Sequence, residues 1–245
     1  MRTLFHTNHY MRNVIIIYME HFNVEPTVLI DDEFCKLAIV VRDSEYATIS
    51  FSSTPPYSNP VPNYQWVAVT EYATAIFVID KTNSWGNHLD WNKIVSMISP
   101  YIANAKEVHA IGFCMGGTNS IIASNFIKID RVVAFTPQYS VHPDILTGRS
   151  YLDQFRNYIT KWPYKSLENM FNDETEYILV LADNPDDNIQ NVFFEDKSNI
   201  TKYNLGEDSG HDGPNLLGNK MGDTVYNLMM GNNKPLVEFI INEAI

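Results

Sequence analysis

Short, almost wholly apolar runs separated by stretches with helical spacing constrain the fold of this chain most. Runs without polar alternation predict strands that are buried on both faces of a sheet. Strands that alternate with helices predict an α/β protein with a doubly wound, mostly parallel sheet. The runs are rich in Val and Ile and span residues 37–41, 47–51, 75–79, 108–112, 131–135, 177–181 and 200–205.

The helical stretches lie between and after these runs. Apolar residues recur at helical spacing over residues 91–101, with Asp90 as the expected N-cap. Further helices are expected over residues 121–126 and over residues 236–245. The first two strands, 37–41 and 47–51, are close enough along the chain that we expect them to pair.

Two segments do not fit the repeating pattern. Residues 54–64 contain four prolines, which block helices and central strands, so this segment is expected to be a loop. Residues 139–173 are too long for a simple connection and have partly helical spacing. We expect the second segment to lie over the sheet as a lid inserted into a single domain of residues 1–245.

The composition excludes several classes of function. Asp and Glu outnumber Lys and Arg by 29 to 17, for a formal net charge of −12, which argues against a nucleic-acid partner. Two cysteines make neither a disulfide framework nor a metal site, and they suit a reducing compartment. No apolar run approaches the roughly 18 residues of a membrane helix. The expectation is a cytoplasmic protein without metal, cofactor or membrane contact, with its oligomeric state left open.

The most informative motif is Gly112-Phe113-Cys114-Met115-Gly116-Gly117, between a predicted strand and a predicted helix. A nucleophile at such a junction lies on a strained turn, and small residues two positions before and after it let the backbones pass closely. The N-terminal N–H groups of the helix would point at the thiol, which favours a thiolate and an oxyanion. Cys114 is therefore the candidate nucleophile, whereas Cys35 is expected to be inert packing.

This motif resembles the nucleophile elbow of α/β-hydrolases, in the cysteine version found in the dienelactone hydrolase family. The resemblance implies a Cys-His-Asp triad, whose acid follows a later strand and whose histidine comes last. Asp183 follows residues 177–182, and His211 lies in a glycine-flanked loop after the last predicted strand. We assign Cys114, Asp183 and His211 to the triad, with Asp186 and Asp187 as alternatives for the acid. The other histidines lack such a context and are expected to be structural or solvated: His6, His9, His21, His88, His109 and His142.

The remaining site residues are assigned by position in the fold. The backbone N–H of Met115, directly after the nucleophile, is the first expected oxyanion donor, and Ser52 or Ser53 should supply the second. Trp85 and Tyr139 follow predicted strands at the same edge, as does Trp66, and such rings could stack on a substrate.

The resemblance and the motif predict an enzyme without a cofactor that acts on a small-molecule acyl substrate. His211 would take the Cys114 proton, the thiolate would attack an acyl carbon, and a thioester would form. The leading hypothesis is hydrolysis of a small ester, lactone or acylated sugar. The alternatives are an acyltransferase of the same fold, or a non-catalytic accessory protein, for example in surface polysaccharide assembly.

Overall fold

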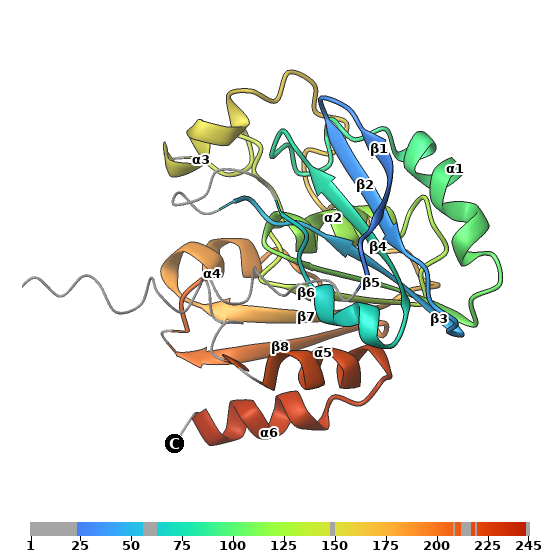
Figure 1. Ribbon diagram of the computed structural model, residues 1–245. Helices are drawn as coiled ribbons and strands as arrows, with labels where there is room; N and C mark the ends of the chain where they lie inside the picture. The colour runs from blue at the N-terminus through green and yellow to red at the C-terminus, as the bar shows by residue number, and fades with distance from the viewer. Residues whose placement is uncertain are drawn as a thin grey trace, which may run out of the picture.

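A computed structural model describes residues 24–55, 63–147, 150–207, 209–211, 217–218 and 220–243 of this chain. These residues form an eight-stranded sheet in the order β1-β2-β4-β3-β5-β6-β7-β8, with helices on both faces (Figure 1). The strands are β1 (Thr27–Asp31), β2 (Cys35–Val40), β3 (Tyr46–Phe51), β4 (Thr74–Asp80), β5 (Glu107–Phe113), β6 (Arg131–Phe135), β7 (Glu176–Asp183) and β8 (Ile200–Glu207). The helices are the 3-10 helix η2 (Val67–Glu71), α1 (Trp91–Ile102), α2 (Met115–Ala123), α3 (Ser150–Arg156), α4 (Pro185–Asn191), α5 (Met221–Met229) and α6 (Lys234–Glu243).

The sheet is mostly parallel, as predicted. Strand β2 runs antiparallel to both of its neighbours, β1 and β4, and the pairs from β4 to β8 are all parallel. The expected pairing of residues 37–41 with residues 47–51 is wrong, because β4 lies between β2 and β3. After β3 the chain returns through η2 and forms β4, which runs parallel to β3. Strand β4 therefore occupies the edge of β3 with which β2 would have paired.

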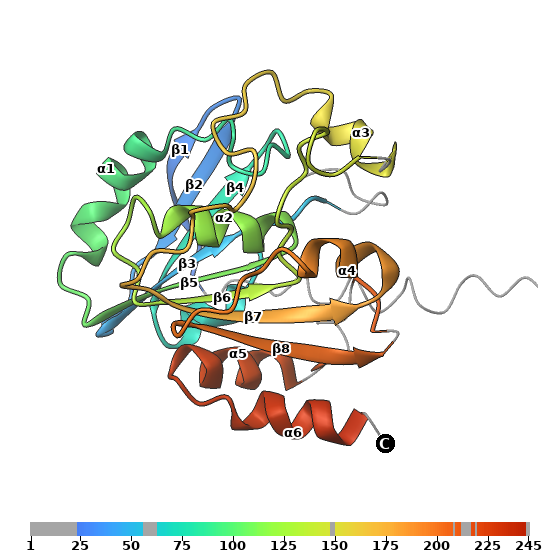
Figure 2. The ribbon, with the colours of Figure 1, turned by 180° about the vertical axis from the view of Figure 1, so that it is seen from behind.

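Both faces of the sheet are buried, which explains the continuous apolar runs. In β4, Ile76 and Val78 pack into one cluster with α1 and α2, whereas Ala75 and Phe77 pack into a second cluster with η2, α5 and α6. Figure 2 shows α1 and α2 in front of the sheet, with α5 and α6 packed against it from the other side. A strand covered in this way has no solvent-facing side and therefore no polar alternation.

Most predicted elements agree with the structure, but α2 (Met115–Ala123) begins at once after Cys114 and ends before Phe126, so it only overlaps the helix expected over residues 121–126. The seven predicted strands correspond to β2 to β8, and the Asp90 side chain caps α1 by accepting from the backbone N–H of Lys93 at 3.0 Å. Strand β1 escaped prediction because only Ile30 of its five residues is buried. Residues 56–62 of the predicted proline loop, and the last two residues of the predicted C-terminal helix, lie outside the described part of the chain.

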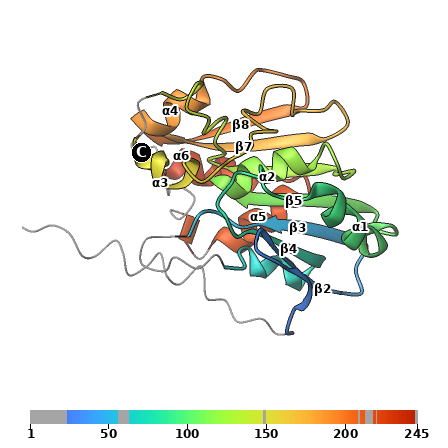
Figure 3. The ribbon, with the colours of Figure 1, turned by 90° about the horizontal axis from the view of Figure 1, so that it is seen from above.

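The segment over residues 139–173 contains a single seven-residue helix, α3, within its described part. Four of its apolar side chains pack with Trp85 and Met115, beside the carboxyl ends of the strands: Val141, Leu146, Leu152 and Ile159. Figure 3 shows α3 at this end of the sheet. Among the described helices, none is long and apolar enough to cross a membrane.

Candidate active site

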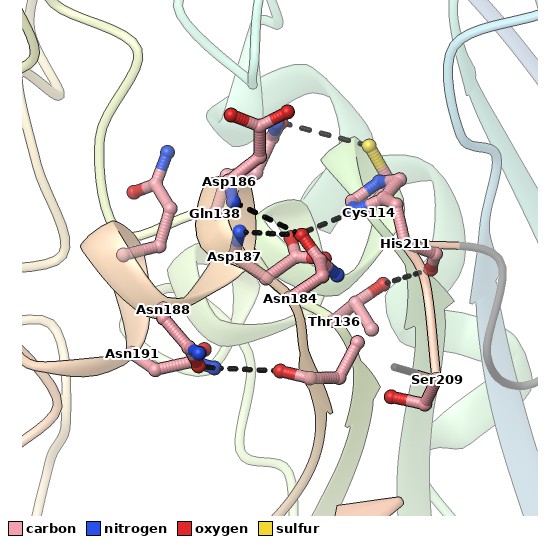
Figure 4. Close-up of polar contacts among 12 residues, drawn as sticks. Cys114, Thr136, Gln138, Asn184, Asp186, Asp187, Asn188, Asn191, Ser209 and His211 are labelled. Carbon is pink, nitrogen blue, oxygen red and sulfur yellow. Dashed lines mark hydrogen bonds and ion pairs between the residues drawn. The ribbon is translucent and has the colours of Figure 1, made fainter. Parts of the chain in front are cut away.

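Cys114 lies between β5 and α2, on a backbone that few residues other than glycine adopt. Its φ of 54° and ψ of −119° belong to the strained turn that was predicted from the motif. The turn is anchored by the Cys114 N–H, which donates to the Phe135 carbonyl at 2.9 Å. The side chain is 6% exposed and lies at the carboxyl end of the sheet, where α/β proteins bind ligands (Figure 4).

The glycines around Cys114 are required by close backbone contacts. A Cβ at Gly112 would lie 2.1 Å from the carbonyl carbon and oxygen of Gly116. A Cβ at Gly116 would lie 2.4 Å from the Phe51 carbonyl oxygen. These contacts are with backbone atoms, which cannot rotate away, so β5, α2 and β3 can approach this closely only with glycine at both positions.

We expect Gly112→Ala to destabilise the protein by more than about 3 kcal/mol, because the added methyl group overlaps the backbone of α2. The matched control is Gly222→Ala in α5, where the new Cβ would be 3.9 Å from the nearest atom and would favour the helix by about 0.5–1 kcal/mol. Chemical denaturation measures both free energies of unfolding. Equal stability of the two variants would contradict the close packing of the elbow.

His211 is brought to Cys114 by an irregularity between β7 and β8. The strand register shifts so that Leu181 pairs with Asn204 but Asp183 pairs with Glu207, which adds a residue to β8. Gly206 within this bulge and Gly210 in the following loop have φ values of 99° and 63°, as the glycine-flanked loop predicted. The chain thereby turns back towards the end of β5, and the His211 ring lies 5.3 Å from that of Phe113 between ring centroids.

The carboxylate that contacts the imidazole belongs to Asp187. Its Oδ1 lies 2.7 Å from His211 Nδ1, and its side chain is 8% exposed. Asn184 holds it in place as the N-cap of α4: Asn184 Oδ1 accepts from the backbone N–H groups of Asp186 and Asp187, while Asn184 Nδ2 donates to Asp187 Oδ2 at 2.5 Å. The start of α4 therefore fixes the carboxylate that faces the histidine.

The assignment of Asp183 as the acid is replaced by Asp187. Asp183 Oδ1 accepts from Asn188 Nδ2 at 2.7 Å, and Asp183 Oδ2 accepts from Asn204 Nδ2 at 3.5 Å, so this carboxylate is engaged by two amides and not by the imidazole. The backbone N–H of Asp183 donates to Ser209 Oγ in the following loop at 2.8 Å. Asp183 lies at the end of β7, as predicted. Side chains alternate between the two faces of a strand, so a position at the strand end does not by itself decide whether the side chain faces the site. The carboxylate of Asp187, in the first turn of α4, reaches the ring instead.

The surroundings of His211 favour its protonated form. Burial by itself lowers the pKa of His211, but the charge at Cys114, the hydrogen bond with Asp187 and the hydrogen bond with Cys114 together raise it well above its usual value. The imidazole side chain is 35% exposed, so solvent reaches it from one side. A histidine that meets a carboxylate at Nδ1 and interacts with a cysteine sulfur can exchange a proton with that sulfur.

We expect the His211 ring to titrate above its usual pKa of about 6.5, measured by NMR of the ring protons. His109 is the internal contrast, because burial lowers its pKa despite its contact with Glu107. In Asp187→Asn the pKa of His211 should fall while that of His109 stays. Because the folded-state pKa of His211 is raised, its contribution to stability is complete below about pH 6.5 and disappears as the pH rises through the folded value. A His211 pKa at or below 6.5 in the native protein would contradict this arrangement.

One of the two expected oxyanion donors fits the structure, and the other does not. Met115 is the first residue of α2, where the backbone N–H has no acceptor within the helix. The Ser52 N–H instead donates to the Val78 carbonyl at 3.0 Å, because β3 continues its pairing with β4 for one residue beyond Phe51. The Ser53 N–H donates to Gln65 Oε1 at 3.1 Å. Neither serine backbone is therefore available as predicted, although the buried Ser52 hydroxyl has no hydrogen-bond partner among the described residues.

Gln138 is a site residue that the sequence analysis missed. Its Oε1 accepts from the Trp85 indole N–H at 2.6 Å and from the Cys114 thiol at a sulfur–oxygen distance of 3.6 Å. Its backbone is fixed by Thr118 of α2, whose hydroxyl accepts from the Gln138 N–H and donates to the Gln138 carbonyl. The only sequence signal was its place directly after β6, at the same edge of the sheet as Cys114.

The aromatic residues predicted to contact substrate are packed against the protein. Trp85 is 3% exposed and lies against Phe155 of α3, so its ring faces the protein interior and its N–H faces Gln138. The Tyr139 ring stacks on Phe193 with a centroid distance of 5.1 Å. Trp66 stacks on Phe135 in the same manner. The stacking surface expected from Trp85 and Tyr139 is thus taken up by neighbouring side chains.

Two further expectations concern the remaining histidines and cysteine. His109 and His142 are buried and engage carboxylates or neighbouring rings, as expected of structural residues, whereas His6, His9 and His21 lie outside the described residues. Cys35 is buried in β2, and burial raises the pKa of its thiol to about 12. Within the described ranges, no group of three or more His, Cys, Asp and Glu side chains is placed to hold a metal ion.

Comparison with solved structures identifies the class of fold. The chain has an α/β-hydrolase fold: it is similar to the esterase Pf2001 of Pyrococcus furiosus (TM-score 0.56, 14% identity, 85% of this chain and 91% of that chain). It is also similar to an α/β serine hydrolase homologue from Coxiella burnetii (TM-score 0.54, 11% identity, 86% and 97%). Another similar structure is the capsule O-acetyltransferase of Neisseria meningitidis serogroup A (TM-score 0.58, 12% identity, 88% and 99%). The sequence matches no family profile and no curated protein.

Proposed function

We propose that this protein cleaves the acyl group from a small ester, lactone or acylated sugar through a thioester on Cys114. The observation that carries the proposal is the placement of the His211 imidazole between the Asp187 carboxylate, at 2.7 Å, and the Cys114 thiol on its strained turn. Nucleophile, base and orienting acid then follow the geometry of a catalytic triad. The likeness to the dienelactone hydrolase family, which rests on residues 112–117 and on a cysteine nucleophile, supports the same chemistry.

The proposed reaction has two halves. His211 removes the proton from Cys114, a C–S bond forms with the acyl carbon, and the leaving alkoxide departs with the proton from His211. In the second half His211 takes a proton from water, the resulting hydroxide attacks the thioester, and the carboxylic acid leaves as the thiol regains its proton. Asp187 keeps the proton of the neutral ring on Nδ1, so that the other nitrogen can accept. The Met115 N–H would stabilise the oxyanion in both halves.

Acyl transfer is the second function that the site supports. It requires only that an alcohol, in place of water, attacks the same thioester. The similarity in fold to a capsule O-acetyltransferase supports this alternative. The chain is also similar in fold to one chain of the Glycosylation Associate Protein (Gap123) complex from Streptococcus agalactiae, 47% of which the match covers. This likeness supports an accessory role as a further alternative.

Trapping of the acyl-enzyme tests the proposal. We expect p-nitrophenyl acetate to give a burst of p-nitrophenol and a mass increase of one acetyl group on Cys114, measured by intact-mass and peptide mass spectrometry. The Cys114→Ala variant should give neither, whereas Cys35→Ala should behave as the native protein. Adding alcohols or sugars then separates hydrolysis from transfer by the product formed. An unmodified Cys114 after incubation with a series of short acyl esters and lactones would favour the accessory role.

A further inference from the structure

Gln138 touches the reactive sulfur without belonging to the triad. Its Oε1 accepts from Cys114 Sγ at 3.6 Å (Figure 4). The same oxygen lies 2.6 Å from the indole nitrogen of Trp85. The side chain is almost fully buried, and its backbone is fixed on both sides by the Thr118 hydroxyl. Both the position and the orientation of this amide are therefore set by the protein.

Trp85 determines which end of the amide faces the sulfur. An indole N–H can only donate, so the atom of Gln138 that meets it at 2.6 Å must be the oxygen. Trp85 is itself held in an unusual backbone conformation, with φ of 52°. The buried Asp80 carboxylate fixes the turn on both sides of it by accepting from the backbone N–H groups of Ser84 and Gly86.

An amide oxygen next to a cysteine distinguishes between the two states of the sulfur. A thiol can donate its proton to the oxygen, as Cys114 does here, whereas a thiolate would face a lone pair and receive no hydrogen bond. The amide nitrogen at the same place would have the opposite effect. Among the described residues, the titratable groups that face this sulfur are His211 and, behind it, Asp187; Asp183 is turned towards Asn188, and Asp186 is exposed on α4.

We infer that Gln138 and Trp85 form a positioning pair that favours the thiol form of Cys114 and so opposes the transfer of its proton to His211. Gln138 accepts the thiol proton, and Trp85 keeps the amide from turning its nitrogen to the sulfur. The thiol gives up this hydrogen bond when its proton passes to His211, so the pair raises the pH at which the nucleophile becomes active. This inference rests on the proposed function in that His211 is the base that competes with Gln138 for the proton.

The test is the pH profile of Cys114 alkylation by iodoacetamide in the native protein and in variants of the pair. Gln138→Met removes the acceptor and keeps the shape, so the pH of half-maximal alkylation rate should fall by about one unit. Gln138→Glu adds a negative charge and should raise it by at least as much. Trp85→Phe frees the amide to turn its nitrogen to the sulfur and should lower the midpoint. Phe155→Leu, which disturbs the packing of the Trp85 ring but leaves its N–H, is the matched control and should leave the midpoint unchanged.

The outcomes separate this inference from the proposed function. Opposite shifts in Gln138→Met and Gln138→Glu, with a lowered midpoint in Trp85→Phe, support the pair, because a loss of packing cannot move the midpoint in both directions. Unchanged midpoints in all three variants, with native alkylation still dependent on His211, would overturn the pair and leave the triad intact. Alkylation of the native protein that is slow and independent of His211 would overturn the proposed function, and the inference with it.

Discussion

Cys114→Ala is expected to lower kcat for p-nitrophenyl acetate by at least about 10⁴-fold, because the proposed acyl-enzyme forms on the Cys114 sulfur. The fold should persist, since alanine keeps the Cβ and makes the same backbone demands at φ 54°. The free energy of unfolding, from chemical denaturation, should therefore change far less than the activity. Activity within tenfold of the native value would show that the turnover arises elsewhere on the molecule.

Asp187→Asn is expected to lower kcat by about 10³- to 10⁴-fold, through the tautomer of His211. Asn184 Nδ2 donates to one oxygen of Asp187, so an asparagine at this position must turn its own oxygen to Asn184. Its NH₂ group then faces His211 Nδ1, which must lose its proton to accept. The proton of the neutral ring moves to the nitrogen that faces Cys114, and that nitrogen can no longer act as a base.

Asp183→Asn is the matched control for this effect. Asparagine retains an oxygen that can accept from Asn188, and the backbone bond of residue 183 to Ser209 is unaffected, so kcat should stay within about threefold of the native value. Steady-state kinetics of the two variants at one pH measures the contrast. A large loss in Asp183→Asn with a small loss in Asp187→Asn would restore the acid assignment made from the sequence.

The sequence predicted the sheet well because its signal is local. Continuous apolar runs mark strands buried on two faces, and seven of the eight strands in the described part of the chain were found from them. The elbow was predicted for a similar reason, because both glycines lie two positions from Cys114 in the chain. Gly112 is needed by a contact with the backbone of Gly116, whereas Gly116 is needed by a contact with the distant Phe51 carbonyl oxygen of β3. The order of strands at the β2 edge was missed, because β4 is inserted between two strands that are neighbours in the chain.

The details of the site depend on contacts between distant segments, which the sequence does not display. The choice of Asp187 over Asp183 follows from the cap at Asn184 and from the direction of one helical turn. The role of Gln138 depends on a contact with Trp85, 53 positions away in the chain. The rings of Trp85 and Tyr139 were correctly placed after strands, yet α3 and Phe193 cover them. Position at the sheet edge is therefore predictable, whereas the direction of a side chain there is not.

The central claim is that Cys114 is a nucleophile activated by His211, and the rate of its alkylation tests this most directly. Cys35 is the internal control, because burial raises the pKa of its thiol to about 12. At neutral pH we expect iodoacetamide to label Cys114 at least about 100-fold faster than Cys35, and His211→Gln to remove most of that difference. Labelling of Cys114 as slow as that of Cys35, and unchanged in His211→Gln, would contradict the account.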